Sequence, residues 1–181
     1  MTSTLPRPAR TEPPLRGDEA TTLRTFLDYH RDTLRWKTDG LTAEQLRTPL
    51  PPSDMTLGGL LKHLAYVESQ WFRVVLAGEE PLPPFDAVDW SSDPDWEWHS
   101  AADDSPEDLR GLYDAAVAES DRVLDAALSR GGLDELSTRE SRQGDGRFSV
   151  RWILVHMLEE YSRHNGHADL LREALDGLTG E

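Results

Sequence analysis

The chain has 181 residues, of which 37% are hydrophobic and six are tryptophan, enough to bury the core of a single domain. Its formal net charge of −15 argues against nucleic acids and anionic membrane surfaces as partners. The absence of cysteine excludes a disulfide framework, a thiolate metal site and a nucleophilic cysteine, so any thiol chemistry needs a thiol from outside the chain. The N-terminus has no apolar signal core, and no run approaches the ~18–20 apolar residues that span a bilayer. We therefore expect a cytoplasmic protein that is not a membrane protein.

Residues 1–16 contain four prolines and scattered charges, which predicts an extended N-terminal arm, and residues 17–181 are expected to form one domain. A first helix is predicted to begin after Asp18, to run to Trp36, and to end before Gly40. Thr42-Ala-Glu-Gln45 has the capping-box pattern and predicts a short helical turn before the next prolines.

Thr56 is the predicted cap of a second long helix that ends near Gly78. Its apolar positions follow helical spacing, namely Leu57, Leu60, Leu64, Val67, Trp71 and Val74. His63 lies at the margin of this apolar face. The long connection over residues 79–104 holds Trp90, Trp96 and Trp98. We expect it to pack over one end of the helices, and the alternative is that it forms the wall of a substrate pocket.

Ser105-Pro106 has the cap and the first-position proline that begin a helix, which is predicted to end at Gly131. A second long connection, residues 131–148, follows, and Ser149 begins a last helix that ends around Gly177. No segment shows a convincing strand alternation. The sequence therefore predicts an all-α protein, a four-helix bundle with two long connecting loops.

Glu160 and His164 lie four residues apart in the last helix, so both side chains occupy one face, one turn apart. At about 100° per residue they fall at the edge of an apolar arc formed by Ile153, Met157, Tyr161, Ala168 and Leu171. If this helix packs against the one that carries His63, two nitrogens and one oxygen converge. Three ligands with open positions are typical of a catalytic divalent metal site. The alternative is that each group is simply hydrogen-bonded at the core edge.

Two further histidines, His156 and His167, flank this pair. We interpret them as catalytic residues next to the metal site, which orient a ligand residue or accept a proton, and not as metal ligands themselves. Tyr66, Gln70, Arg151 and Trp152 lie about one turn from the ligands and are candidates for lining a substrate or cofactor pocket. The alternative for these four is ordinary surface and core.

Three segments together resemble a known family. Residues 159–171 (EEYSRHNGHADLL) resemble the last helix of the DinB-like superfamily, residues 60–72 resemble its second helix, and residues 34–41 the end of its first. Within that superfamily the chain resembles the actinobacterial branch of mycothiol-dependent S-transferases and mini-circle proteins. The resemblance covers about residues 16–175.

The resemblance implies a four-helix bundle in which one histidine of the second long helix and two residues of the last helix hold a metal. Carried over by position, the ligands are His63, Glu160 and His164, where Glu160 replaces the histidine of many members. His167 stands where many members have glutamine. A divalent metal is implied, with zinc most fitting, and nickel, iron and manganese remain open.

The function implied is a metal-dependent thiol S-transferase that conjugates mycothiol to an electrophilic small molecule. Two alternatives are a metal-binding stress protein without turnover and a metal-dependent hydrolase. The sequence leaves open whether the protein is a monomer or a homodimer.

Overall fold

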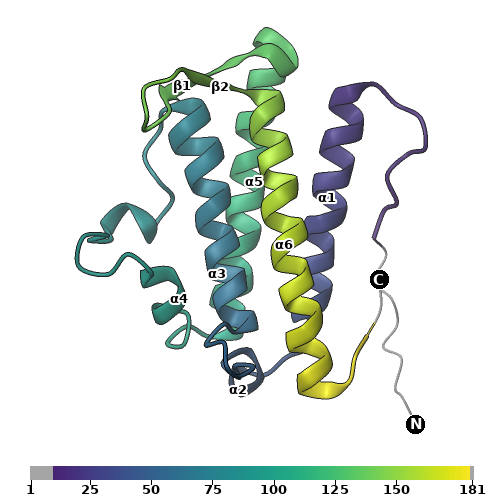
Figure 1. The fold of residues 1–181 in the computed structure, drawn as a ribbon, viewed down its shortest axis with the longest axis vertical. Helices are drawn as coiled ribbons and strands as arrows, with labels where there is room; N and C mark the ends of the chain where they lie inside the picture. Colours follow the sequence, from purple (N-terminus) through teal and green to yellow (C-terminus); the bar gives the residue numbers. More distant parts are fainter. Residues whose placement is uncertain (1–9, 180–181) are drawn as a thin grey trace.

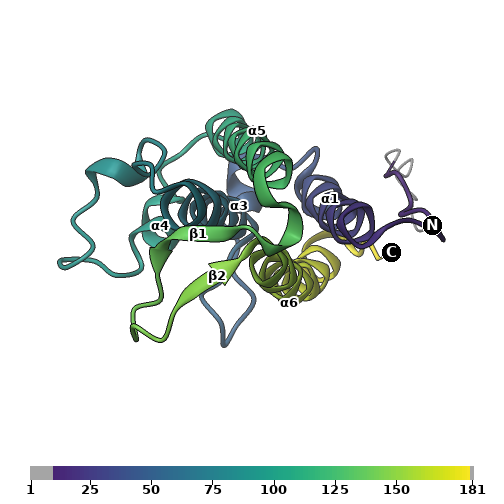
Figure 2. The same ribbon diagram turned by 90° about the horizontal axis from the view of Figure 1, so that it is seen from above.

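Four long helical segments run side by side in the computed structural model, which describes residues 10–179 (Figure 1). They are α1 (Glu19–Thr38), α3 (Leu57–Glu68) with a π-helical continuation (Ser69–Ala77), α5 (Pro106–Gly131) and α6 (Val150–Asp176). Seen from above, they surround a common interior, with α1 against α6 and α3 against α5 (Figure 2). The remaining elements are α2 (Ala43–Leu46), α4 (Trp96–Ser100), two single 3₁₀ turns (Phe85–Ala87 and Gly132–Asp134), and strands β1 (Leu136–Glu140) and β2 (Arg147–Ser149). The described chain is thus mostly helical, with one small sheet.

The predicted helix starts are confirmed. At each start, a polar side chain accepts a hydrogen bond from a backbone N–H three residues on, which satisfies a donor that the helix itself leaves free. These caps are Asp18, Thr42, Thr56, Ser105 and Ser149. The capping box is also present, because the Gln45 side chain accepts from the backbone N–H of Thr42. Local chemistry therefore defines where the helices begin.

The prediction that residues 131–148 contain no strand is wrong. β1 and β2 pair as an antiparallel hairpin above the π-helical segment and α6. Only Ser137 of these strand residues is fully buried, and its hydroxyl accepts from Phe148 N and donates to Arg139 O. Apart from Phe148, which packs against Trp71 and Trp152, the strand side chains are polar or exposed, and for this reason the strands lack the apolar alternation by which strands are recognised.

The Trp-rich connection lies along the side of α3, not over the end of the helices as expected (Figure 1). Gly59 makes room for it, because a Cβ at that position would lie 2.8 Å from Trp98 Cε3. The buried Lys62 amine pairs with Asp104 at 2.5 Å and lies 4.4 Å from the centroid of Trp96. These contacts fix α4 against α3.

A buried polar network sets the positions of α1, α3 and α6 relative to one another. The Arg31 guanidinium donates to both carboxylate oxygens of Glu68, at 2.7 and 2.8 Å, and both side chains are almost fully buried. Tyr161 of α6 donates to Glu68 at 2.7 Å, and its hydroxyl also lies 2.8 Å from that of Tyr113. Since Tyr161 follows Glu160 directly and Glu68 lies five residues after His63, this network joins α3 to α6 within about two helical turns of the predicted ligands.

The apolar arc of α6 is confirmed as core, since all five of its predicted residues are buried. Of the predicted arm, residues 1–9 lie outside the described residues. Arg10 packs against α1 between the rings of Tyr29 and Trp36, 4.7 Å from each centroid. Among the described residues, no helix combines the length and the hydropathy that crossing a bilayer would take.

Candidate metal centre

His63, Glu160 and His164 come together between α3 and α6. One potential ligand atom from each lies within 4.8 Å of the others, and the two imidazole centroids are 4.8 Å apart. Bonds of about 2.1 Å to one zinc ion place ligand atoms at most about 4.2 Å apart. Shifts of less than about 1 Å would therefore bring all three onto one ion. His164 is buried and the other two are half-buried, so one side of the group faces the surface.

Glu160 is held by histidines on both sides along α6. Its carboxylate lies 3.4 Å from His164 Nε2 and 3.5 Å from His156 Nε2. The hydrogen bond with His164 lowers the pKa of Glu160, although partial burial opposes this effect. The carboxyl group is therefore ionised at neutral pH, which is the form that binds a cation.

Glu97 of α4 is a site residue that the sequence reasoning missed. Its side chain is 4% exposed, and Oε1 lies 3.0 Å from His63 Nδ1. Since a carboxylate only accepts, His63 donates from Nδ1 and keeps its lone pair on Nε2. A carboxylate behind a ligand histidine is the usual way in which proteins fix the tautomer and ring orientation of such a ligand. The one sequence signal was its position between Trp96 and Trp98, which indicates a segment that packs inward.

The buried polar atoms around the group fit a bound metal. Glu97 Oε2, His164 Nδ1 and His167 Nδ1 are buried and have no hydrogen-bond partner within residues 10–179. Such atoms are uncommon in folded proteins, and their clustering indicates that a polar or charged group completes the centre. The carboxylates of Glu97 and Glu160 carry the two negative charges that neutralise a divalent cation. The residues present therefore fit a divalent metal.

Trp98 covers one side of the centre. Its ring stacks on His63 with centroids 4.4 Å apart and planes inclined by 24°, and it lies 6.0 Å from the His164 ring. Stacking against an indole removes water from that side of the imidazole. The Trp-rich connection thus packs against the candidate centre, and the alternative that it forms the wall of a substrate pocket stays a prediction.

His156 and His167 lie beside the centre, as expected of flanking residues. His156 stacks on Trp152 and meets Trp71 edge-on, with centroids 5.1 and 4.5 Å away. His167 lies 5.4 Å from His164, ring to ring, and its pKa is lowered, first by burial and then by the neighbouring positive groups. Neither ring belongs to the group of three whose ligand atoms converge.

The four predicted pocket residues lie in different places. Gln70 and Trp152 line a hollow of about 630 Å³ between the π-helical segment, α6 and the hairpin. Tyr66 packs against Phe85 and Trp90, and burial raises the pKa of its hydroxyl.

Arg151 does not point toward the centre. Its guanidinium pairs with Glu19 at 2.7 Å and with Asp134, and so joins α6 to the start of α1 and to the turn before β1. The structure therefore gives this residue a role in helix packing and not in the hollow.

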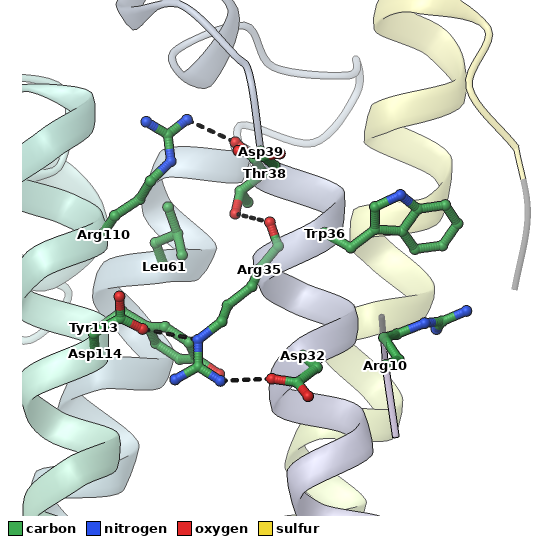
Figure 3. A pocket seen from close by; sticks show the side chains of 10 residues that line it. All are labelled: Arg10, Asp32, Arg35, Trp36, Thr38, Asp39, Leu61, Arg110, Tyr113 and Asp114. Carbon is green, nitrogen blue, oxygen red and sulfur yellow. Dashed lines mark hydrogen bonds and ion pairs between the residues drawn. The ribbon is translucent and has the colours of Figure 1, made fainter. Parts of the chain in front are cut away.

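A separate cavity of about 330 Å³ lies between α1 and α5, shown in Figure 3. Its cationic side chains on these two helices are already engaged. Arg35 donates to Asp32 and Asp114, each at 2.8 Å, and Arg110 donates to the carbonyl oxygens of Thr38 and Leu41. These bonds hold the end of α1 to α5. None of the predicted site residues lines this cavity.

Comparison with known proteins agrees with the resemblance noted in the sequence. A sequence model of the family described as mycothiol-S-transferase matches residues 22–177, which include every residue of the candidate metal centre. No curated protein matches the chain. With almost its entire length matched, the chain belongs to the mycothiol-S-transferase family.

Proposed function

We propose that this protein is a metal-dependent thiol S-transferase, built as a DinB-like four-helix bundle over residues 17–181. The proposal is carried by one observation, the convergence of His63, Glu160 and His164 from two helices. With three protein ligands, further coordination positions remain for a substrate, as in catalytic and not structural zinc sites. Zinc suits two nitrogens and one carboxylate best, although nickel, iron and manganese accept the same donors.

A divalent metal at this centre would favour the thiolate over the thiol at neutral pH, and the thiolate is the nucleophile. Because the chain has no cysteine, the thiol is a co-substrate. The family name supports mycothiol as that thiol. The second substrate is an electrophilic small molecule, and its reactive carbon must lie next to the thiol sulfur.

The protein residues have separate roles in this proposal. Glu97 holds His63 with Nε2 available for the metal, and His156 holds the Glu160 carboxylate from the opposite side to His164. Trp98 excludes water from the face of His63. His156 and His167 remain the proposed groups for taking up the thiol proton, since both lie within one turn of a ligand.

The test is to incubate metal-free and metal-loaded protein with mycothiol or glutathione and with chlorodinitrobenzene. Metal-dependent acceleration is expected with mycothiol, and it should be lost in His63→Ala. His99→Ala is the matched control, because His99 lies two residues from Glu97 but is exposed and pairs with Asp93. If no thiol reacts faster than background while the metal is fully bound, the protein either binds metal without turnover or is a hydrolase.

A further inference from the structure

The hollow beside the metal centre has a wall of three aromatic rings, Trp71, Phe148 and Trp152. Trp152 lies 4.6 Å from Phe148 and 5.3 Å from Trp71, centroid to centroid, and Trp71 meets Phe148 edge-on at 5.3 Å. Although Trp152 has these neighbours, it is 45% exposed, the largest side chain among the exposed hydrophobic residues of the described chain. An indole left in water next to a hollow of about 630 Å³ is typical of a surface that a ligand covers.

This aromatic wall is continuous with the metal centre through His156. The His156 ring stacks on Trp152 with an interplanar angle of 19°, and its Nε2 lies 3.5 Å from Glu160. Trp152 precedes Glu160 by eight residues on α6, a distance of about 12 Å along the helix. A substrate that reaches both places must therefore extend along α6 from the aromatic wall toward Glu160.

The rim of the hollow does not favour ligands of one particular charge. Arg142 lies there together with Glu140 and Asp145, so groups of both signs are present. Gln70 and Gln143 add side-chain amides that can bond to polar substituents. The aromatic wall is what distinguishes the hollow, and a flat aromatic ring is the group that gains most from packing against it.

We infer that this hollow binds the electrophilic co-substrate, with a planar aromatic group on the Trp71–Trp152 wall and the reactive carbon directed toward the metal centre. The inference rests on the proposed transferase function and names the class of its second substrate. For an aryl-methyl halide, the thiolate sulfur forms the S–C bond, the C–halogen bond breaks, and the halide leaves with the bonding electron pair. The thiol proton passes to solvent by way of the proposed acceptors, His156 or His167, so no oxidant or reductant is needed.

The test compares 2-(chloromethyl)naphthalene with chloroacetamide, two chlorides that differ in whether they carry an aromatic group. Trp152→Ala should raise the KM for the naphthyl chloride by about tenfold, the size expected when ring stacking and its buried area are lost. The KM for chloroacetamide and for the thiol should change by less than about twofold. Phe26→Ala is the matched control, since Phe26 is also 45% exposed but lies on α1, and it should change neither. Trp152→Leu, which keeps an apolar side chain, should show the same selective loss if Trp152→Ala folds poorly.

Binding of unreactive 2-naphthylacetamide, followed by quenching of tryptophan fluorescence in metal-loaded protein, separates this inference from the proposed function. If Trp152→Leu binds 2-naphthylacetamide more weakly but no thiol is turned over by the wild type, the aromatic binding site is supported and the transferase function is refuted. If the protein turns over both chlorides and the Trp152 substitution changes both KM values equally, the aromatic binding site is refuted and the transferase function is supported. A raised KM for the thiol alone would assign the hollow to the thiol and overturn the inference.

Discussion

Glu97 accepts a hydrogen bond from His63 Nδ1 at 3.0 Å, although the two residues are 34 positions apart in the chain. The contact joins the Trp-rich connection to the metal centre through a carboxylate that is almost fully buried. A buried carboxylate is costly unless it has a partner, and the partner here is His63, one of the three proposed metal ligands. The segment therefore does more than cover α3, since it also holds the imidazole of His63.

The first prediction concerns this contact. Glu97→Ala should weaken zinc binding by about 10–100-fold, because the His63 ring loses the group that fixes its orientation and tautomer. Competition with a chromophoric chelator measures the affinity directly. Asp104→Asn is the control, since Asp104 anchors the same segment through Lys62 without touching a ligand. Equal losses in both variants would mean that Glu97 acts only by anchoring α4.

The second prediction is that the protein binds about one divalent ion per chain. His63→Ala and His164→Ala should each lower the metal content measured by elemental analysis, because each removes one of three ligands. Glu160→Gln should also lower the affinity, by more than the ~10–100-fold typical of residues behind a ligand. These variants should stay folded, since the apolar faces of α3 and α6 are unchanged. Full occupancy in both histidine variants would refute the assignment.

A third prediction uses two glycines inside helices. Gly59→Ala should lower the free energy of unfolding and displace Trp98, because the new Cβ would lie 2.8 Å from the indole. Gly111→Ala in α5 should instead raise it, by up to ~1 kcal/mol, since nothing lies within 4 Å and alanine is the better helix former. Urea denaturation measures both. Stabilisation of the protein by Gly59→Ala would show that Trp98 does not need this close approach.

The helices and the convergence of His63, Glu160 and His164 could be predicted from the sequence because both depend largely on local spacing. A cap such as Ser105 acts on a backbone N–H three residues away, and Glu160 and His164 share a face because they are four residues apart. His63 could be added since it lies at the edge of a second apolar stripe, and the resemblance to a family supplied the pairing of the two helices.

Residues whose role depends on distant contacts could not be predicted in this way. Nothing near Glu97 in the sequence indicates that it contacts His63. The Arg151 side chain points away from the candidate centre because it pairs with Glu19, which lies 132 positions earlier. The hairpin was missed because its strands are mostly exposed, and its position depends on Gly78, where a Cβ would lie 2.6 Å from Thr138 Cγ2. These positions are set by tertiary packing and not by periodicity.

The last prediction concerns the buried network that joins α3 to α6 near the proposed ligands. Tyr161→Phe should lower the free energy of unfolding by about 1–3 kcal/mol, because the buried Glu68 carboxylate loses one of its donors and the Tyr113 hydroxyl loses one of its two partners. Tyr29→Phe is the matched control: Tyr29 is half-buried, no hydrogen bond of its hydroxyl is found within residues 10–179, and the change should stay within about 0.5 kcal/mol. Urea denaturation of the metal-free proteins gives both values.

Since Tyr161 directly follows Glu160, Tyr161→Phe should also weaken zinc binding in the chelator competition, whereas Tyr29→Phe should not. A stability loss with unchanged zinc affinity would show that the network holds the fold without positioning the ligands.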